Sequence, residues 1–288
     1  MDPQTFLDIS TKVLKLKMFP YFHIAHYSLM CIMVREDNHP PSPGSQRSPE
    51  FSRKHPLASW MASMLMCFGG GIIGNLLFGE FPLAPFKSHE NVIIASATWY
   101  LINYSPFDVV YKLATMLPIR ITLWVMKEIE RGKKVYDGVA YVAKLYPDAY
   151  LLMAFMGTIK AGGSNLMIPF QRAVRGIWLP QLNEFLRPSY VIKASLGGAI
   201  IFILERTQIL VAPHAVIYFG VVIFFIYFRL SAILLGISDP FVPFENLFSA
   251  IFFGGMWDAL KKAVEKEKRT ENGATPGEIK SKEEKKRD

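Results

Sequence analysis

The chain has 288 residues, of which 51% are hydrophobic and only 19% are charged, and its formal net charge is +8. A soluble domain has about 25% charged residues, so this composition excludes an ordinary water-soluble domain and favours a protein that crosses a membrane several times. Residues 258–288 alone hold 10 basic and 8 acidic side chains, which leaves the rest of the chain poorer still in charge. The positive charge is not gathered into a nucleic-acid-binding surface.

The N-terminal half contains three stretches with few or no charges. They cover residues 18–34, residues 55–79 with 25 positions free of formal charge, and residues 91–107. A helix needs roughly 20 apolar residues to cross a bilayer core of about 30 Å. The third stretch is expected to end at Pro106, because proline disfavours helix at the residue before it. The proline-rich segment 35–55 predicts a polar loop.

The C-terminal half adds four more stretches. Residues 109–126, 149–171 and 190–204 are apolar but contain lysine or arginine, whereas 207–228 has 22 residues without a formal charge. We therefore predict an all-α membrane protein with seven transmembrane helices. Residues 258–288 are expected to form a charged, largely disordered tail.

An internal repeat relates the two halves of the chain. Met18-Phe19-Pro20 matches Met116-Leu117-Pro118, and Gly74-Asn75-Leu76-Leu77 matches Ser164-Asn165-Leu166-Met167. A transmembrane domain at 1–257 then contains one repeat at about 6–105, a second at about 106–206 and a seventh helix at about 208–236. Because each repeat has three spans, the second enters the membrane from the opposite side, which gives an inverted 3+3 repeat plus one helix. Such repeats place a site at their interface near the bilayer midplane.

Each repeat contains a glycine segment that ends in asparagine, and this segment has two interpretations. Small residues let transmembrane helices pack closely, and they also let a helix break and turn backbone carbonyls towards a water-filled path. One copy does not decide between the two, but recurrence at corresponding positions favours the path. The candidate pore and helix-break residues are Gly69, Gly70, Gly71, Gly74, Asn75, Gly162, Gly163, Ser164 and Asn165.

Four charged residues lie at or within the predicted spans, namely Asp108, Lys112, Arg120 and Lys160. A Lys or Arg at the centre of a membrane helix costs roughly 2.5–3.5 kcal/mol on insertion scales, so it normally faces a bundle interior, a partner or water. Asp108 precedes Lys112 by the four-residue spacing of an ion pair on one helix face. Lys112 also lies close enough to a helix end to reach the interface, whereas Lys160 does not. A lysine that moves in the membrane field is a candidate voltage sensor.

Lys127 and Arg131 stand four residues apart at the end of the fourth predicted span. They share one helix face, and both donate hydrogen bonds of the kind that phosphate oxygens accept. Basic clusters beside a membrane span are typical of anionic-lipid sites. An ordinary charged helix end has the same pattern, and the spacing alone favours that simpler interpretation.

Enzyme-like constellations are scarce in this sequence. The pair His23 and His26 has no acidic or cysteine ligand at metal spacing, and the glycines at 69–74 lack the Lys-Ser/Thr of a phosphate-binding loop. Cys31 and Cys67 form no disulfide framework. We therefore expect no catalytic residue, no metal and no cofactor.

Three segments together resemble the trimeric intracellular cation channels, and the B-type members are the most similar. The segments are GGGIIGN at 69–75, WVMKEIERG at 124–132 and KAGGSN at 160–165, and the resemblance extends over about 5–257. It implies a homotrimer whose subunits each have a pore, lined by the second and fifth helices at the two glycine segments. It also implies that a phosphoinositide, phosphatidylinositol bisphosphate, binds at Lys127 and Arg131, which reverses the simpler interpretation above.

The function that this resemblance implies is a potassium-permeable channel of the endoplasmic or sarcoplasmic reticulum that supplies counter-ion current during calcium release. Loop charge is nearly balanced between the two sides, and the basic tail favours a cytosolic C-terminus. A secondary transporter is the alternative, because inverted repeats with broken helices are typical of that class. The segment 36–52 and the tail have no counterpart in the resemblance, so no role is carried over to them.

Overall fold

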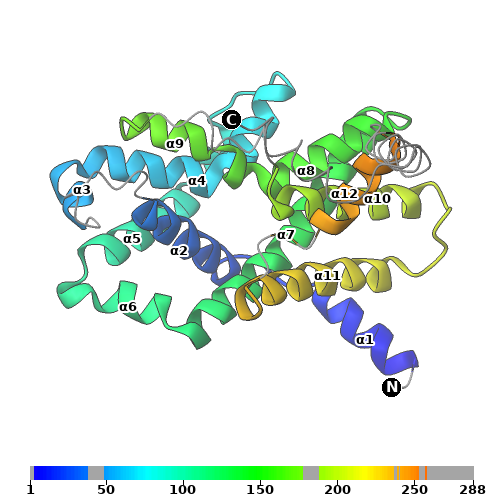
Figure 1. The fold of residues 1–288 in the computed structure, drawn as a ribbon, viewed down its shortest axis with the longest axis horizontal. Helices are drawn as coiled ribbons and strands as arrows, with labels where there is room; N and C mark the ends of the chain where they lie inside the picture. The colour runs from blue at the N-terminus through cyan, green and yellow to red at the C-terminus, as the bar shows by residue number, and fades with distance from the viewer. Residues whose placement is uncertain are drawn as a thin grey trace, which may run out of the picture. The chain divides into compact units, whose positions relative to one another are not determined.

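The computed structural model describes residues 3–37, 49–177, 188–236, 239, 241–252 and 257, and every regular element in these ranges is a helix. The first half contains α1 (Pro3–Leu14), α2 (Tyr21–Glu36), α3 (Pro49–Lys54), α4 (Pro56–Leu77), the 3-10 turn η1 (Ala84–Lys87) and α5 (His89–Tyr104). The second half contains the turn η2 (Pro106–Asp108), α6 (Val109–Thr115), α7 (Leu117–Leu145), α8 (Tyr150–Leu166), α9 (Ile168–Val174), α10 (Tyr190–Arg206), α11 (His214–Leu234) and α12 (Val242–Phe252) (Figure 1).

The chain divides into two compact units, residues 1–239 and 240–288. Within the first unit, α2, α4 and α5 lie together on one side and α8, α10 and α11 on the other, with α7 between them (Figure 1). Helix α4 packs against α8, and α2 packs against α7, so the two predicted repeats meet along both pairs of helices. The second unit contains α12, on which Leu247, Phe248 and Phe252 are exposed.

Helices form where all seven spans were predicted, but their lengths differ. Among the described residues, α4, α11 and α8 continued by α9 are long and apolar enough to cross a membrane. Helices α6 and α7 form a fourth span if they are counted together, although they are bent by 63°. Helices α2, α5 and α10 have 16, 16 and 17 residues, which is short of the roughly 20 that a complete crossing needs. The all-helical class is confirmed, and the count of seven spans stays a prediction.

The fourth predicted span departs most from expectation. Met116, with an extended ψ of 135°, separates α6 from α7, and α7 then continues for 29 residues, far beyond the predicted end at 126. Opposite charges three and four residues apart face each other on a helix and stabilise it. The pairs on α7 are Arg131 with Glu128, Lys134 with Glu130 at 2.8 Å, and Lys133 with Asp137 at 3.7 Å. Lys127 and Arg131 therefore lie inside a helix and not at its end.

The segment 35–55, predicted as a polar loop, is partly helical. Helix α2 extends through Glu36, and α3 forms at Pro49–Lys54. The buried hydroxyl of Ser52 lies 2.9 Å from that of Ser59 on α4, and Tyr104 of α5 donates a hydrogen bond to the Ser52 carbonyl. These contacts fix the end of the segment to two helices. Residues 38–48 and the tail at 258–288 lie outside the described residues.

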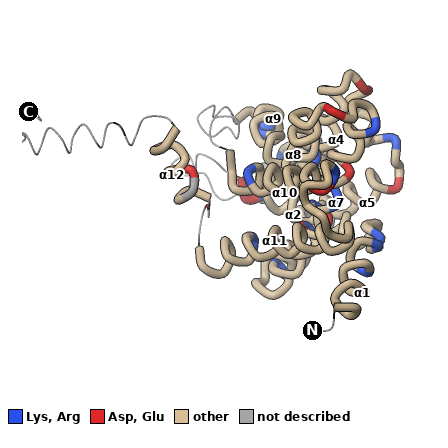
Figure 2. The backbone as a smooth tube through the Cα atoms, turned by 90° about the vertical axis from the view of Figure 1, so that its right-hand side faces the viewer, with Lys and Arg blue, Asp and Glu red and all other residues tan. Residues whose placement is uncertain are grey.

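The core of the first unit is apolar, yet it has charges beside it. Met30 of α2, Met64 of α4 and Ile102 of α5 are among its fully buried side chains, and both cysteines are buried and free. Figure 2 shows that charged residues are sparse along α10 and α11 and more frequent in α7. The central helix therefore carries charge into the interior of an otherwise apolar bundle.

Candidate functional site

Helices α4 and α8 cross at their glycine segments, with backbone against backbone. A methyl group added at Gly70 would lie 2.3 Å from the carbonyl oxygen of Lys160, and one added at Gly163 would lie 2.2 Å from the Cα of Gly70. Helix α4 continues from Pro56 to Leu77 through its glycines, so the helix break expected there is absent. The physical reason is that α8 occupies the space left by the missing side chains, and the glycines of α4 serve close helix packing.

The asparagines of the two glycine segments each donate a hydrogen bond. Asn75 Nδ2 donates a hydrogen bond to the carbonyl of Phe81 in the connection after α4, at 3.3 Å. Asn165 Nδ2 donates to the hydroxyl of Ser189, just before α10, at 3.1 Å. Each asparagine thus holds the end of its helix to a later part of the chain. The acceptors differ, since one is a backbone carbonyl and the other is a side-chain hydroxyl beyond α9, and the inverted repeat stays a prediction.

A cavity of about 210 Å³ lies beside this crossing. Its polar lining comes from five helices, with His23 and His26 from α2, the backbone of Gly70 and Gly71 from α4, Asn91 from α5, Glu130 and Lys134 from α7, and Lys160 and Ser164 from α8. These residues include members of both predicted glycine segments. The structure therefore brings the two segments together around a polar space.

Two buried atoms in this cavity face each other without a hydrogen-bond partner among the described residues. They are Nδ1 of His26 and Oε2 of Glu130, which lie 3.9 Å apart. Nε2 of His26 lies 3.0 Å from the carbonyl oxygen of Cys67 and must donate to it, so Nδ1 of the neutral ring carries a lone pair. Since buried polar atoms are normally paired, this geometry suits a water molecule or a cation between the two lone pairs.

Two lysines border the same cavity. Lys134 Nζ lies 2.8 Å from Oε1 of Glu130. Lys160 is half-buried, and its Nζ lies 4.3 Å from the ring centre of Tyr141, whose hydroxyl donates to Glu80. The cavity is thus bordered by two lysines and by the carboxylate of Glu130.

Lys127 and Arg131 are buried in the middle of α7, with only 5% and 3% of their surfaces exposed. Arg131 pairs with Glu128 of the same helix, and Arg229 of α11 donates to the other oxygen of that carboxylate at 2.9 Å. The aromatic ring of Trp124 lies 4.9 Å from Lys127 Nζ and 3.7 Å from the Arg229 guanidinium. We call Lys127, Glu128, Arg131 and Arg229 the basic cluster.

The basic cluster has three cations and one carboxylate. A buried charge without a counter-charge costs several kcal/mol, so this excess favours binding of an anion. Nε of Arg131 is buried and has no hydrogen-bond partner in the described part of the chain. The hydrogen-bonding contact of Lys127 Nζ is to a weak acceptor, Met30 Sδ, at 3.7 Å. Phosphate oxygens are strong acceptors for both groups.

Sequence reasoning missed Arg229 as a member of this cluster and Trp124 as the aromatic ring beside it. Arg229 is the charge that ends the charge-free stretch 207–228, so it was visible as a boundary but not as a site residue. Its distance of about a hundred positions from Glu128 hid the contact, because such pairs depend on how helices pack and not on local spacing.

The other predicted intramembrane charges pair differently from expectation. Asp108 lies in left-handed backbone, with φ 56°, in the turn before α6, and its carboxylate lies 3.0 Å from the guanidinium of Arg35 on α2. The expected pair with Lys112 does not form because Asp108 precedes the helix, and Lys112 is exposed. Arg120 lies 3.5 Å from Glu36 in a partly exposed pair.

A carboxylate just beyond the end of α2 joins the two repeats. Asp37 accepts hydrogen bonds from Gln171 at 2.6 Å and from Arg172 at 2.7 and 2.9 Å, and Arg175 donates to its backbone carbonyl. Burial alone would raise the pKa of Asp37, but the hydrogen bonds from Arg172 and Gln171 outweigh it and hold the pKa below its usual value. Asp37 thus links α2 to α9.

Replacing Asp37 by asparagine is expected to lower the free energy of unfolding by about 1–3 kcal/mol at pH 7. The folded-state pKa is lowered, so the stabilisation is complete above the unfolded pKa of about 4 and is lost as the pH falls through the folded pKa. Thermal unfolding in detergent should therefore show a difference between wild type and Asp37→Asn that narrows below pH 4. The control is Glu90→Gln, which removes an exposed carboxylate in the first turn of α5. A difference independent of pH would contradict the ionic role of Asp37.

Comparison with known proteins agrees with this architecture. The family model of the TRIC channel matches residues 45–236. Trimeric intracellular cation channel type 1B.1 of Caenorhabditis elegans is 48% identical over 265 residues, which cover 92% of this chain and 88% of that relative. The type B channel of Xenopus tropicalis is 36% identical over 251 residues, which cover 87% of this chain and 86% of that relative.

Solved structures show the same similarity. A trimeric intracellular cation channel from C. elegans in the absence of Ca²⁺ matches with a TM-score of 0.75 and 41% identity, over 83% of this chain and 100% of that one. A structure of TRIC counter-ion channels in calcium release matches with a TM-score of 0.73 and 33% identity, over 80% of this chain and 99% of that one. This chain is therefore a member of the trimeric intracellular cation (TRIC) channel family, with relatives of the B type.

Proposed function

We propose that the protein is a homotrimeric, potassium-permeable channel of the endoplasmic or sarcoplasmic reticulum membrane, with a cytosolic C-terminus and one pore in each subunit. Its current would balance charge during calcium release. Related proteins are named trimeric and intracellular, and one related structure is described as a counter-ion channel in calcium release. We also propose that each subunit has seven transmembrane helices, arranged as an inverted 3+3 repeat plus one helix.

The observation that carries the proposed ion path is the polar cavity beside the α4–α8 crossing. Two buried acceptor atoms that face each other, His26 Nδ1 and Glu130 Oε2, cost free energy when neither has a hydrogen-bond partner. Packing of the helices alone does not explain this arrangement. Such atoms are suited to replace part of the hydration shell of a passing cation. A path here runs between the second and fifth predicted spans and touches both glycine segments.

Voltage response is assigned to the lysines at this path. Lys134 and Lys160 line the cavity, and a unit charge that crosses the whole field changes the energy by about 2.3 kcal/mol per 100 mV. Lys160 is the better candidate, because its long side chain contacts an aromatic ring whereas Lys134 forms a direct ion pair with Glu130. Lys112 and Arg120 are exposed or partly exposed and are weaker candidates.

A phosphoinositide, represented by phosphatidylinositol bisphosphate, is proposed to occupy the basic cluster. The support is the excess of buried positive charge together with the unpartnered Nε of Arg131. Arg229 is proposed as a third cation of this site, because it donates to Glu128, the same carboxylate that pairs with Arg131. The lipid would then join α7 to α11 and stabilise each subunit.

Single-channel recording tests the channel function. Purified protein in planar bilayers, with KCl on one side and NaCl on the other, is expected to give stepwise currents and a reversal potential that shows potassium permeation. Glu130→Gln should change the unitary conductance severalfold by removing the carboxylate from the path, whereas Lys133→Gln on the exposed face of α7 should leave it unchanged. Saturable exchange without current steps would instead identify a secondary transporter.

A further inference from the structure

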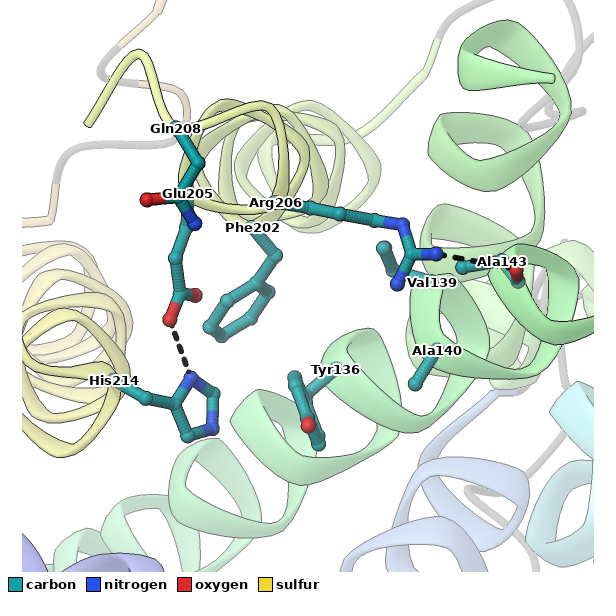
Figure 3. A pocket seen from close by; sticks show the side chains of 9 residues that line it. All are labelled: Tyr136, Val139, Ala140, Ala143, Phe202, Glu205, Arg206, Gln208 and His214. Carbon is teal, nitrogen blue, oxygen red and sulfur yellow. Dashed lines mark hydrogen bonds and ion pairs between the residues drawn. The ribbon is translucent and has the colours of Figure 1, made fainter. Parts of the chain in front are cut away.

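A second cavity, separate from the proposed ion path and from the basic cluster, lies where α7, α10 and α11 meet. It has a volume of about 490 Å³ (Figure 3), within the range of about 300–1,000 Å³ that is usual for small-molecule sites. The residues that give it chemical character are Tyr136, Phe202, Glu205, Arg206, Gln208 and His214. Nothing in the proposed conduction mechanism uses them.

One wall of this cavity is formed by three aromatic rings from three different helices. The ring of Tyr136 on α7 lies 4.7 Å from that of His214 on α11 and 5.5 Å from that of Phe202 on α10, measured between centroids. The faces of aromatic rings attract a cation through their quadrupoles, and Tyr136 and Phe202 both line the cavity. The wall is therefore apolar in surface but attractive to positive charge.

A carboxylate stands beside the aromatic wall. Glu205 accepts a hydrogen bond from Nδ1 of His214 at 2.7 Å, which fixes the carboxylate next to the rings (Figure 3). Aromatic faces combined with a carboxylate recognise alkylated ammonium groups, because such groups carry positive charge yet are weakly hydrated. A primary ammonium is strongly hydrated and would lose that hydration against the aromatic rings, whereas a trimethylammonium loses little.

The positive charge of the cavity is on Arg206, on the side opposite Glu205. The guanidinium of Arg206 extends away from Glu205 towards α7, where Nη2 donates to the carbonyl of Ala143 at 3.3 Å (Figure 3). An arginine has five N–H donors, so others remain for a phosphate, which arginine binds well. The two walls thus complement a zwitterion with its ammonium towards Glu205 and its phosphate towards Arg206.

The position of the cavity indicates where such a zwitterion comes from. Helix α11 is long and apolar enough to cross a membrane, and it begins at His214, whereas α10 ends at Arg206. The cavity is thus located at helix ends, at the level of lipid headgroups. We propose that it binds the headgroup of a phosphatidylcholine lipid, with trimethylammonium against Tyr136, Phe202 and Glu205 and phosphate against Arg206. This inference does not depend on the proposed ion path.

Binding of a short-chain lipid to the purified full-length protein tests the proposal. Delipidated protein in detergent is titrated with dihexanoyl phosphatidylcholine, and bound lipid is counted by native mass spectrometry. We expect saturable binding, with much weaker binding of dihexanoyl phosphatidylglycerol and dihexanoyl phosphatidylethanolamine. Equal binding of all three lipids would overturn the proposal. Free phosphocholine should bind more weakly than the lipid, and equal affinity would show a soluble ligand in place of a lipid.

Variants locate the binding in this cavity. Glu205→Gln and Arg206→Gln should each weaken phosphatidylcholine binding about tenfold, as should Tyr136→Leu, which removes one aromatic face. Glutamine at 205 still accepts the hydrogen bond from His214, so this variant is expected to keep its fold and its unfolding temperature. The controls Glu90→Gln and Lys87→Gln change equal charges outside the cavity and should leave affinity unchanged. Unaltered affinity in folded Glu205→Gln and Arg206→Gln would refute this site.

Discussion

Alanine in place of Gly70 or Gly163 is expected to destabilise the protein by about 3 kcal/mol, at the upper end of what overpacking costs. The added methyl at Gly70 would meet the backbone of Lys160 at 2.3 Å, and the one at Gly163 would meet the backbone of Gly70 at 2.2 Å. Because both obstacles are backbone, no side-chain rotation relieves them, and α4 and α8 must move apart. Thermal unfolding in detergent measures the loss, and bilayer recording should show fewer active channels.

Gly74→Ala is the matched control for this experiment. It lies on the same helix, but its added methyl would meet only the side chains of Met156 at 3.4 Å and Lys160 at 3.6 Å, which are ordinary contact distances. A change within about 0.5 kcal/mol is expected there. If Gly74→Ala proved as harmful as Gly70→Ala, helix packing would not explain the glycines. Near-neutral behaviour of Gly70→Ala would show that the two helices are not in backbone contact.

Features that depend on local chemistry were predictable from the sequence. Helix α4 coincides with one of the two longest charge-free stretches, and α11 overlaps the other from His214 onward and extends beyond it to Leu234. Such stretches favour helix in a membrane regardless of their neighbours. The glycine segments were named as candidate site residues from the sequence, and their role in an ion path stays a prediction. The glycines of α4 serve close packing and not a helix break because α8 lies against them. The local sequence does not show which helix packs against α4.

Features that depend on tertiary pairing escaped the sequence pattern. The fourth predicted span ends at residue 126, whereas the charges after that position pair along one face of α7 and extend the helix to Leu145. Asp108 was assigned to Lys112 by spacing, but a turn in left-handed backbone directs it to Arg35. Both errors have the same cause. A spacing of three or four residues brings two charges together only when both lie in one helix, and the sequence pattern did not give the helix boundaries.

Substitutions in the basic cluster are expected to weaken phosphoinositide binding more than substitutions elsewhere in the chain. The double variant Lys127→Ala/Arg131→Ala should weaken binding of dioctanoyl phosphatidylinositol bisphosphate by about a hundredfold or more, because hydrogen bonds to charged groups contribute roughly 1.5–3 kcal/mol each. Titration of the purified protein measures this, with dioctanoyl phosphatidylinositol as the ligand lacking the extra phosphates. The protein should remain folded, since Glu128 keeps its bond to Arg229.

A single variant separates loss of the ligand from loss of the fold. Lys127→Met places a side chain of similar length against the sulfur of Met30, which Lys127 Nζ already contacts at 3.7 Å, and it removes one of the three cations. By relieving buried positive charge it should raise or preserve the unfolding temperature of the lipid-free protein while weakening lipid binding at least about tenfold. Lys133→Met, on the exposed side of the same helix with 41% of its side chain accessible, should change neither quantity. Unchanged phosphoinositide affinity in folded Lys127→Met and in the double variant would place the lipid elsewhere, and the excess charge of the cluster would then need another anion.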